Sequence, residues 1–203
     1  MSSQGTDVIS ALLSVLTSFG VPQRSCVYIS TPISTGTRYV RWHQSFGLQV
    51  PKGSVDYDAA RRRIKDANLA AARSLTADVR ERADGHLVID PTAMDIDGWE
   101  QRDYHLYWME VISRYVHTVV FADGWQYSEG CAVEFAIAAE SGLNLVDHRQ
   151  WPIQLSSGLA MVVQARDLYQ ESGLVSPVLA DVARRLQAVE ARSGALVTVQ
   201  VGK

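Results

Sequence analysis

The sequence has few of the residues from which small proteins build metal centres or disulfide frameworks. Its two cysteines, Cys26 and Cys131, lie far apart in apolar segments of a 203-residue chain. We expect both to be buried free thiols, because a thiol packs in a core as a small apolar group and two cysteines alone make no zinc site. The five histidines are not clustered at metal-ligand spacing, and we expect no metal.

Long apolar runs and an excess of basic charge are also missing. No stretch approaches the roughly 18 apolar residues of a membrane span, and the N-terminus lacks the basic and apolar regions of a secretion signal. We therefore expect a cytoplasmic protein that does not bind membranes. The 19 Lys and Arg are outnumbered by 22 Asp and Glu. This balance argues against a nucleic-acid polymer as partner, because neutralising phosphates needs clustered basic residues. The basic run at 61–65 fits a solvated helix face.

The glycine-rich motifs of common nucleotide-binding proteins are absent as well. Residues 34–37 read Ser-Thr-Gly-Thr, without the G-x-G-x-x-G spacing of a dinucleotide fingerprint or the Gly-Lys-Ser/Thr of a P-loop. We therefore do not expect ATP or GTP hydrolysis, and we expect no bound cofactor.

Short apolar runs alternate with helical patterns along the first three quarters of the chain. The composition, 47% hydrophobic and 20% charged, is that of a globular protein. Helices are predicted over 6–19, 54–83, 100–115 and 130–141, and strands over 26–30, 87–89, 118–121 and 143–146. This alternation predicts one α/β domain with a parallel sheet, spanning residues 1–203 with its core at about 24–150.

Two further regions lie outside this alternation. Residues 34–53 contain four glycine or proline residues, which predicts a long irregular loop. Helical patterns over 157–170 and 174–192 predict a helical C-terminal extension at about 151–203, and residues 196–201 are prone to β-structure. Ligands of such sheets bind beyond the carboxyl ends of the strands, so the segments that follow the strands are the ones expected to carry function.

Glu134 has an unusual position on the helix predicted over 130–141. Its neighbours one turn away are Gly130, Cys131, Ile137 and Ala138, which are all small or apolar. Glu134 therefore lies on the face that packs inward, where a carboxylate costs free energy unless something compensates it. It is either a functional group or a glutamate at the rim of the core that is bonded to a backbone group.

The start of the same helix offers a site for an anion. Ser128 and Gly130 lie at the helix N-terminus, where free N–H groups and the helix dipole attract negative charge. A simple N-cap role for Ser128 fits the spacing equally well. Glu134 lies one turn further along, within a few ångströms of whatever binds there.

Two motifs resemble those of the nucleoside 2-deoxyribosyltransferases and related nucleotide hydrolases. Tyr28-Ile29-Ser30-Thr31-Pro32-Ile33 resembles their opening motif, and Ser128-x-Gly130-x-x-x-Glu134 is similar to their catalytic signature. The segment Val88-Ile89-Asp90-Pro91 falls where such proteins have a comparable strand and loop. The resemblance covers about residues 26–147, and a group of uncharacterised bacterial and phage proteins shares the Gly-Trp-x-x-Ser-x-Gly form of the second motif.

The resemblance implies a flavodoxin-like fold and cleavage of an N-glycosidic bond through a covalent glycosyl-glutamate. Glu134 would be the nucleophile, Tyr28 would hold Glu134 or the sugar, and Asp123 would bind a sugar hydroxyl or help protonate the leaving base. Ser30, Pro32 and Gly130 would contribute to substrate binding. The transferases carry a carboxylate near Ser128, whereas the monophosphate hydrolases carry serine, so Ser128 favours a nucleoside 5′-monophosphate. The family also implies a homo-oligomer.

One departure from the family concerns the leaving base. The transferases have an aspartate on the preceding helix, and here Trp108 falls near that place, with Asp103 or Glu110 as possible substitutes. Trp125, in the loop before Ser128, is a candidate for stacking on a base. Two alternatives stay open: a nucleotide sensor that has lost the chemistry, and a glycohydrolase that cleaves NAD.

Overall fold

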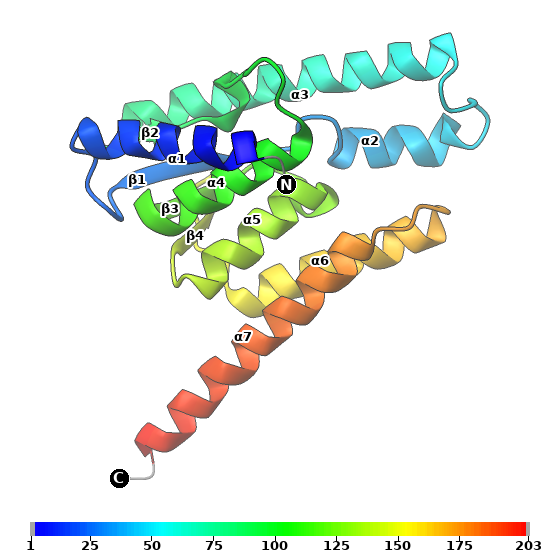
Figure 1. The fold of residues 1–203 in the computed structure, drawn as a ribbon. Coiled ribbons are helices and arrows are strands. Elements are labelled where there is room, and N and C mark those ends of the chain that lie inside the picture. Colours follow the sequence, from blue (N-terminus) through cyan, green and yellow to red (C-terminus); the bar gives the residue numbers. More distant parts are fainter. Residues whose placement is uncertain (1–2, 202–203) are drawn as a thin grey trace.

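The computed structural model describes residues 3–201 and contains a four-stranded parallel sheet in the order β2-β1-β3-β4 (Figure 1). The strands are β1 (Cys26–Ser30), β2 (Val88–Ile89), β3 (Val116–Phe121) and β4 (Asn144–Asp147). This is the strand order of a flavodoxin-like fold. The expected α/β class, with its parallel sheet and helical C-terminal extension, is confirmed.

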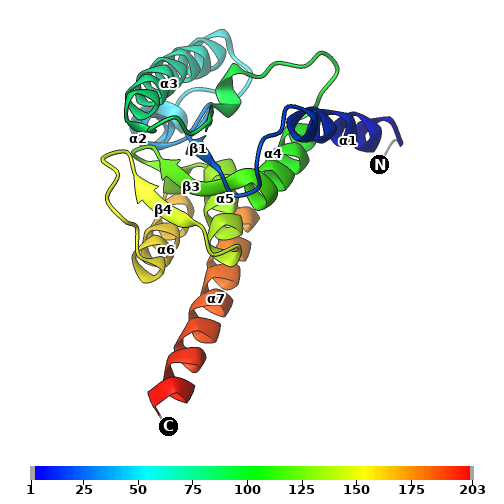
Figure 2. The same ribbon diagram turned by 90° about the vertical axis from the view of Figure 1, so that its left-hand side faces the viewer.

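Helices cover the two faces of the sheet unequally (Figure 2). On one face Tyr28, Val119 and Phe121 belong to the large core, which they share with α4 (Gln101–Tyr115) and α5 (Glu129–Glu140). The N-terminal helix α1 (Ser3–Ser18) packs against α4 at the side of this core. On the other face Val27, Ile29 and Val120 pack with α3 (Val55–Arg82) in a smaller cluster. Successive residues of β1 therefore point to different layers, as the pleat of a strand requires.

The segment 34–53 is more ordered than the sequence predicts. It forms α2 (Thr37–Trp42) and a π-helical turn, η1 (His43–Gly47), so the prediction of a long irregular loop was wrong for these residues. Tertiary contacts explain the difference, since propensity alone stabilises no helix this short. Val40 is buried, the Trp42 ring meets Tyr57 edge-on at 5.5 Å, and Arg61 lies over the Tyr39 ring.

The C-terminal extension consists of α6 (Leu155–Glu171) and α7 (Pro177–Val201), which pack against each other and against α5. In Figure 1, α7 continues well beyond the body of the protein. The prediction that 196–201 is prone to β-structure was wrong, because the helix extends through these residues. Elongating an existing helix adds one hydrogen bond for each residue fixed, which outweighs a weak local preference for strand.

Both cysteines are buried free thiols, as expected. Within residues 3–201, no helix is both long enough and apolar enough to cross a membrane. Among residues 8–192, whose side chains the structure describes, there is no group of three or more His, Cys, Asp or Glu that could hold a metal ion.

Candidate active site

Glu134 lies on α5 and is held by two hydroxyl groups from the neighbouring strand β1. The Tyr28 hydroxyl donates to Glu134 Oε1 at 2.7 Å, and the Ser30 hydroxyl donates to Oε2 at 2.6 Å. Tyr28 and Ser30 are two residues apart on β1, so both point toward α5. Both are fully buried, which fixes the two donors. The compensation for this carboxylate therefore comes from side-chain hydroxyls, and not from a backbone group.

The path of α5 explains how a carboxylate reaches this position. The helix begins after Ser128, and seven of its twelve residues are buried, so it is surrounded by protein on most sides. Glu134 lies on the side of α5 that faces the end of β1 and keeps part of its surface exposed. The carboxylate is thus fixed at the carboxyl end of the central strands, where sheets of this topology bind ligands.

Burial shifts the protonation equilibrium of the Glu134 carboxylate. It raises the pKa of Glu134 to about 7, and the hydrogen bonds from Ser30 and Tyr28 oppose this shift because they favour the charged form. The pKa of Tyr28 is raised well above its usual value, first by burial and then by the charge of Glu134, so Tyr28 stays a donor. Near neutral pH, Glu134 is poised between its two forms, as expected of a carboxylate with a chemical role.

Aromatic rings continue from Tyr28 along α4. The Trp108 ring meets the Tyr28 ring edge-on with centroids 5.8 Å apart, and Tyr107 meets Trp108 at 4.7 Å. Trp99 follows, at 5.8 Å from Tyr107. Trp108 and Trp99 are only partly buried. The residue expected near the base-binding position, Trp108, thus lies directly beside the tyrosine that holds Glu134.

The start of α5 is open beside Gly130. A methyl group built on Gly130 would have only the Ser128 hydroxyl oxygen near it, at 4.0 Å. Ser128 is buried at the N-cap position, but its side chain forms no capping hydrogen bond. Its hydroxyl instead neighbours the thiol of Cys131, whose pKa burial raises to about 12. The simple capping role for Ser128 is therefore not the one observed.

Asp90 is a residue near this site to which sequence reasoning assigned no role. Its carboxylate accepts hydrogen bonds from the Thr92 backbone N–H at 2.9 Å and from the Thr92 and Thr76 hydroxyls at 2.7 and 3.1 Å. Its charge also contributes to the raised pKa of Tyr28. Asp90 follows directly after β2, and residues at the carboxyl ends of parallel strands are the ones expected near a ligand. This position could have identified Asp90 from the sequence.

Comparison with known proteins gives one match. Residues 65–147 match the model of a family described as a domain of unknown function, DUF4406. The matched segment contains Ser128 and Glu134 but not Tyr28 or Ser30. No curated protein and no solved structure matches the chain.

Pro32 and Asp123, which were expected in the same site as Glu134, lie in a different part of the molecule. Both line a cleft of about 460 Å³ on the α3 side of the sheet, which neither Tyr28 nor Glu134 lines. The Asp123 carboxylate forms no hydrogen bond or ion pair with another residue of 8–192, Glu134 included. The structure therefore does not bring Asp123 to the glutamate, because the turn after β3 directs it to the opposite face.

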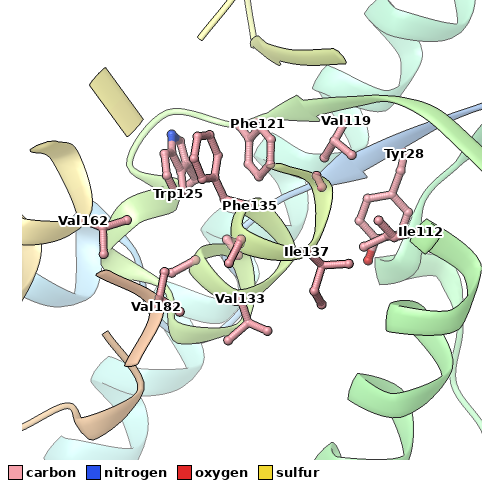
Figure 3. Close-up of a cluster of buried hydrophobic side chains, with 14 of the residues drawn as sticks. Tyr28, Ile112, Val119, Phe121, Trp125, Val133, Phe135, Ile137, Val162 and Val182 are labelled. Carbon is pink, nitrogen blue, oxygen red and sulfur yellow. The ribbon is translucent and has the colours of Figure 1, made fainter. Parts of the chain in front are cut away.

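The structure does not support the expectation that Trp125 stacks on a bound base. It is 2% exposed, and its ring stacks on Phe135 with centroids 4.4 Å apart and packs against Phe121 (Figure 3). A ring enclosed in this way cannot stack on a bound base. Residues Trp125–Tyr127 form a short 3₁₀ turn, η3, that directs the indole into the core.

The two acidic residues considered as substitutes for the family aspartate have structural roles. Asp103 closes a capping box at the start of α4, where its carboxylate accepts from the Glu100 backbone N–H at 3.0 Å. Glu110 pairs with Arg114 on the exposed face of α4 at 2.6 Å. Because each carboxylate is engaged by its own helix, the expectation that Asp103 binds substrate is not supported.

Proposed function

We propose that the protein cleaves the N-glycosidic bond of a nucleoside 5′-monophosphate, with Glu134 as the nucleophile. The observation that carries this proposal is the carboxylate of Glu134, gripped by the Tyr28 and Ser30 hydroxyls beside an open helix N-terminus. A fixed carboxylate with a pKa of about 7, on a residue that keeps part of its surface exposed, is a group that can bond to an electrophilic carbon.

The chemistry follows from the positive charge that develops at the anomeric carbon as the base departs. In the first step, the bond from this carbon to the base nitrogen breaks and a bond to a Glu134 oxygen forms. The base leaves with the electron pair and takes up a proton. In the second step, water attacks the same carbon, the bond from this carbon to the Glu134 oxygen breaks, and the proton that the water loses passes to solvent, which balances the proton taken up by the base. A second base in place of water would make the reaction a transfer.

Tyr28 and Ser30 act as positioning residues in this scheme. Each donates one hydrogen bond to one oxygen of Glu134, and each carboxylate oxygen has a second lone-pair site. The carboxylate is therefore held in one rotamer while it keeps an unshared electron pair for the substrate. Such fixed geometry lowers the entropic cost of reaching the transition state.

The surrounding groups suit a phosphate at one end of the substrate and a base at the other. The N-terminus of the 12-residue helix α5 and the Ser128 hydroxyl can donate to phosphate without charge repulsion. The faces of Trp108 and Trp99 can stack on a base. Nucleoside monophosphates carry both groups, one on each side of the reacting carbon.

A second candidate function is cleavage of NAD at its bond between nicotinamide and ribose. It is favoured by Trp108, which lies beside Tyr28 near the place where the transferases that the sequence resembles have an aspartate. An indole cannot protonate a leaving base. NAD is the nucleotide whose leaving group departs without a proton, because its nicotinamide is already cationic. A protein that only senses nucleotides would also tolerate Trp108 there.

One assay separates these functions. The protein is incubated with each nucleoside 5′-monophosphate, the matching nucleosides and NAD, and free base is measured by chromatography. The test variant is Glu134→Gln, and the matched control is Glu140→Gln, on the same helix but paired with Arg185 at the surface. We expect base release from a monophosphate by the wild type and the control, and none by Glu134→Gln. Equal release by Glu134→Gln would refute the proposal. Nucleotide binding by all three proteins without any release would instead support a sensor.

A further inference from the structure

Adjacent residues at the end of β1 serve opposite faces of the sheet. Ser30 points toward α5 and donates to Glu134, whereas Thr31, the next residue, lines the cleft on the α3 side. The cleft measures about 460 Å³, within the range of small-molecule sites. Tyr28, Ser30, Ser128 and Glu134 do not line it. It is therefore a separate space at the same edge of the sheet.

Two arginine side chains of α2 line this cleft and give it positive charge. Arg38 and Arg41 both line it, and both are exposed side chains. Arg38 donates to Asn68 Oδ1 at 3.0 Å, and the amide group of Asn68 donates to the carbonyl oxygens of Ile33 and Thr35. Asn68 thus fixes the loop before α2 and one guanidinium together. The Arg41 guanidinium has no hydrogen bond or ion pair with another residue of 8–192, so within this part of the chain its donors are free.

Thr31, which lines the cleft, has a buried hydroxyl without a partner. The residue is 8% exposed, and its hydroxyl oxygen has no hydrogen-bond partner among residues 8–192. A buried hydroxyl left unpaired costs free energy that a bound acceptor would recover. Because Thr31 lines the same cleft as the two arginines, the three side chains can bind one anionic group.

The other lining residues offer a different chemistry. Asp78 on α3, Asp123 after β3 and His148 after β4 also line the cleft. Neither carboxylate forms an ion pair or accepts a hydrogen bond from another residue of 8–192. Carboxylates of this kind accept hydrogen bonds from hydroxyl groups, as in sugar recognition. The cleft therefore combines donors for an oxyanion with acceptors for hydroxyls.

We propose that this cleft is a second ligand site that takes a phosphorylated sugar, with its phosphate bound by Arg38, Arg41 and Thr31. Its hydroxyl groups bind Asp123 and Asp78. Bidentate guanidinium donors match the oxygens of a phosphate, and the orphaned Thr31 hydroxyl adds a third donor. The site is independent of Glu134, so it does not rest on the glycosidase proposal.

The test is calorimetric titration with ribose 5-phosphate, which carries no base and so cannot undergo the proposed cleavage. Arg41→Ala removes a phosphate donor, and Thr31→Val removes the hydroxyl while keeping the shape of the side chain. Arg63→Ala on α3 is the matched control, because Arg63 is exposed but does not line the cleft. Glu134→Gln tests whether ribose 5-phosphate binds at the Glu134 site on the opposite face of the sheet instead. Thermal unfolding of each variant establishes that it is folded.

We expect the wild type, Arg63→Ala and Glu134→Gln to bind ribose 5-phosphate equally. Arg41→Ala should weaken binding about tenfold or more, and Thr31→Val severalfold, since hydrogen bonds to a charged group are the strong ones. Hydrogen exchange should slow in peptides covering 31–42 and 68–78 on binding. No binding at millimolar ligand, unchanged binding in Arg41→Ala and Thr31→Val, or loss of binding in Glu134→Gln would overturn the proposal. In that last case the sugar phosphate would occupy the Glu134 site.

Discussion

The hydroxyl of Ser30 and the carboxylate of Glu134 lie 2.6 Å apart although 104 residues separate them in the chain. The contact joins the end of the central strand β1 to the second turn of α5. With the Tyr28 hydroxyl on the other carboxylate oxygen, it holds the side chain at both oxygens. The glutamate is thus held by the most buried part of the sheet, which makes its position depend on the fold as a whole.

The raised pKa of Glu134 predicts a specific dependence of stability on pH. A carboxyl whose pKa rises from 4.5 in the unfolded chain to about 7 in the folded one binds an extra proton only when folded. Its contribution to stability is therefore present below pH 4.5 and is lost as the pH rises through 7. Glu134→Gln keeps the shape without this titration. Because the Gln amide nitrogen cannot accept one of the two hydroxyl hydrogen bonds, the prediction concerns the change with pH: relative to the wild type, Glu134→Gln should gain about 2 kcal/mol of stability between pH 4.5 and pH 8, from roughly 1.4 kcal/mol per pKa unit with allowance for partial exposure.

Thermal unfolding of both proteins between pH 4.5 and pH 8 measures this difference. Glu140→Gln is again the control, because the Arg185 hydrogen bond lowers the pKa of Glu140 and its titration lies at lower pH. A constant difference between Glu134→Gln and wild type across this range would mean that Glu134 does not titrate there.

Tyr28→Phe should move the pH dependence of activity upward. The nucleophile must be ionised, so kcat/KM should rise with pH through about 7 and then level off. The Tyr28 hydroxyl favours the charged carboxylate, and its removal raises the pKa of Glu134 further. We expect the midpoint to shift up by about one unit. Tyr115→Phe removes a hydroxyl bonded to Thr17 elsewhere in the core and should leave the midpoint unchanged. An identical midpoint in Tyr28→Phe would remove Tyr28 from the positioning role.

Gly124→Ala should destabilise the loop that follows β3. Gly124 has φ +73°, and an added methyl group would clash with the Thr37 hydroxyl. The matched control is Gly142→Ala, which has φ +65° but meets nothing within 4 Å. The left-handed conformation alone costs about 1 kcal/mol, and overpacking adds about 1–3 kcal/mol. Chemical denaturation should therefore show a larger loss in Gly124→Ala. Equal losses would show that α2 is free to move away from this loop.

The centre of the site could be predicted from sequence because it depends on periodicity. Glu134 falls on the inward face of a helix by its spacing, and Tyr28 and Ser30 share one side of a strand by theirs. Periodicity alone does not determine that this strand and this helix meet, and the contact of Tyr28 with Glu134 was expected only from the resemblance of the two motifs to those of the transferases. The same alternation assigns Thr31 to the opposite face.

The side chains of the connecting segments could not be predicted in the same way. Trp125 in a site loop looks like a base-stacking residue, and only its packing against Phe121 and Phe135 shows that it belongs to the core. Asp123, from the same turn, points to the other face of the sheet. The helix α2 was not predicted, because glycine residues on both sides of it indicate a loop. It is stabilised by contacts with α3, which no local sequence pattern contains.

The most direct test of the central claim is the mass of the protein during turnover. The protein is mixed with a nucleoside 5′-monophosphate from which it releases base, and the reaction is quenched in acid within the first turnovers. The protein is then digested, and the masses of its peptides are measured by mass spectrometry. The account predicts a peptide containing Glu134 that is heavier by one sugar phosphate, with the added mass localised to Glu134 and absent in Glu134→Gln. Free base without any such adduct, or an adduct on a different residue, would contradict the assignment of Glu134 as nucleophile.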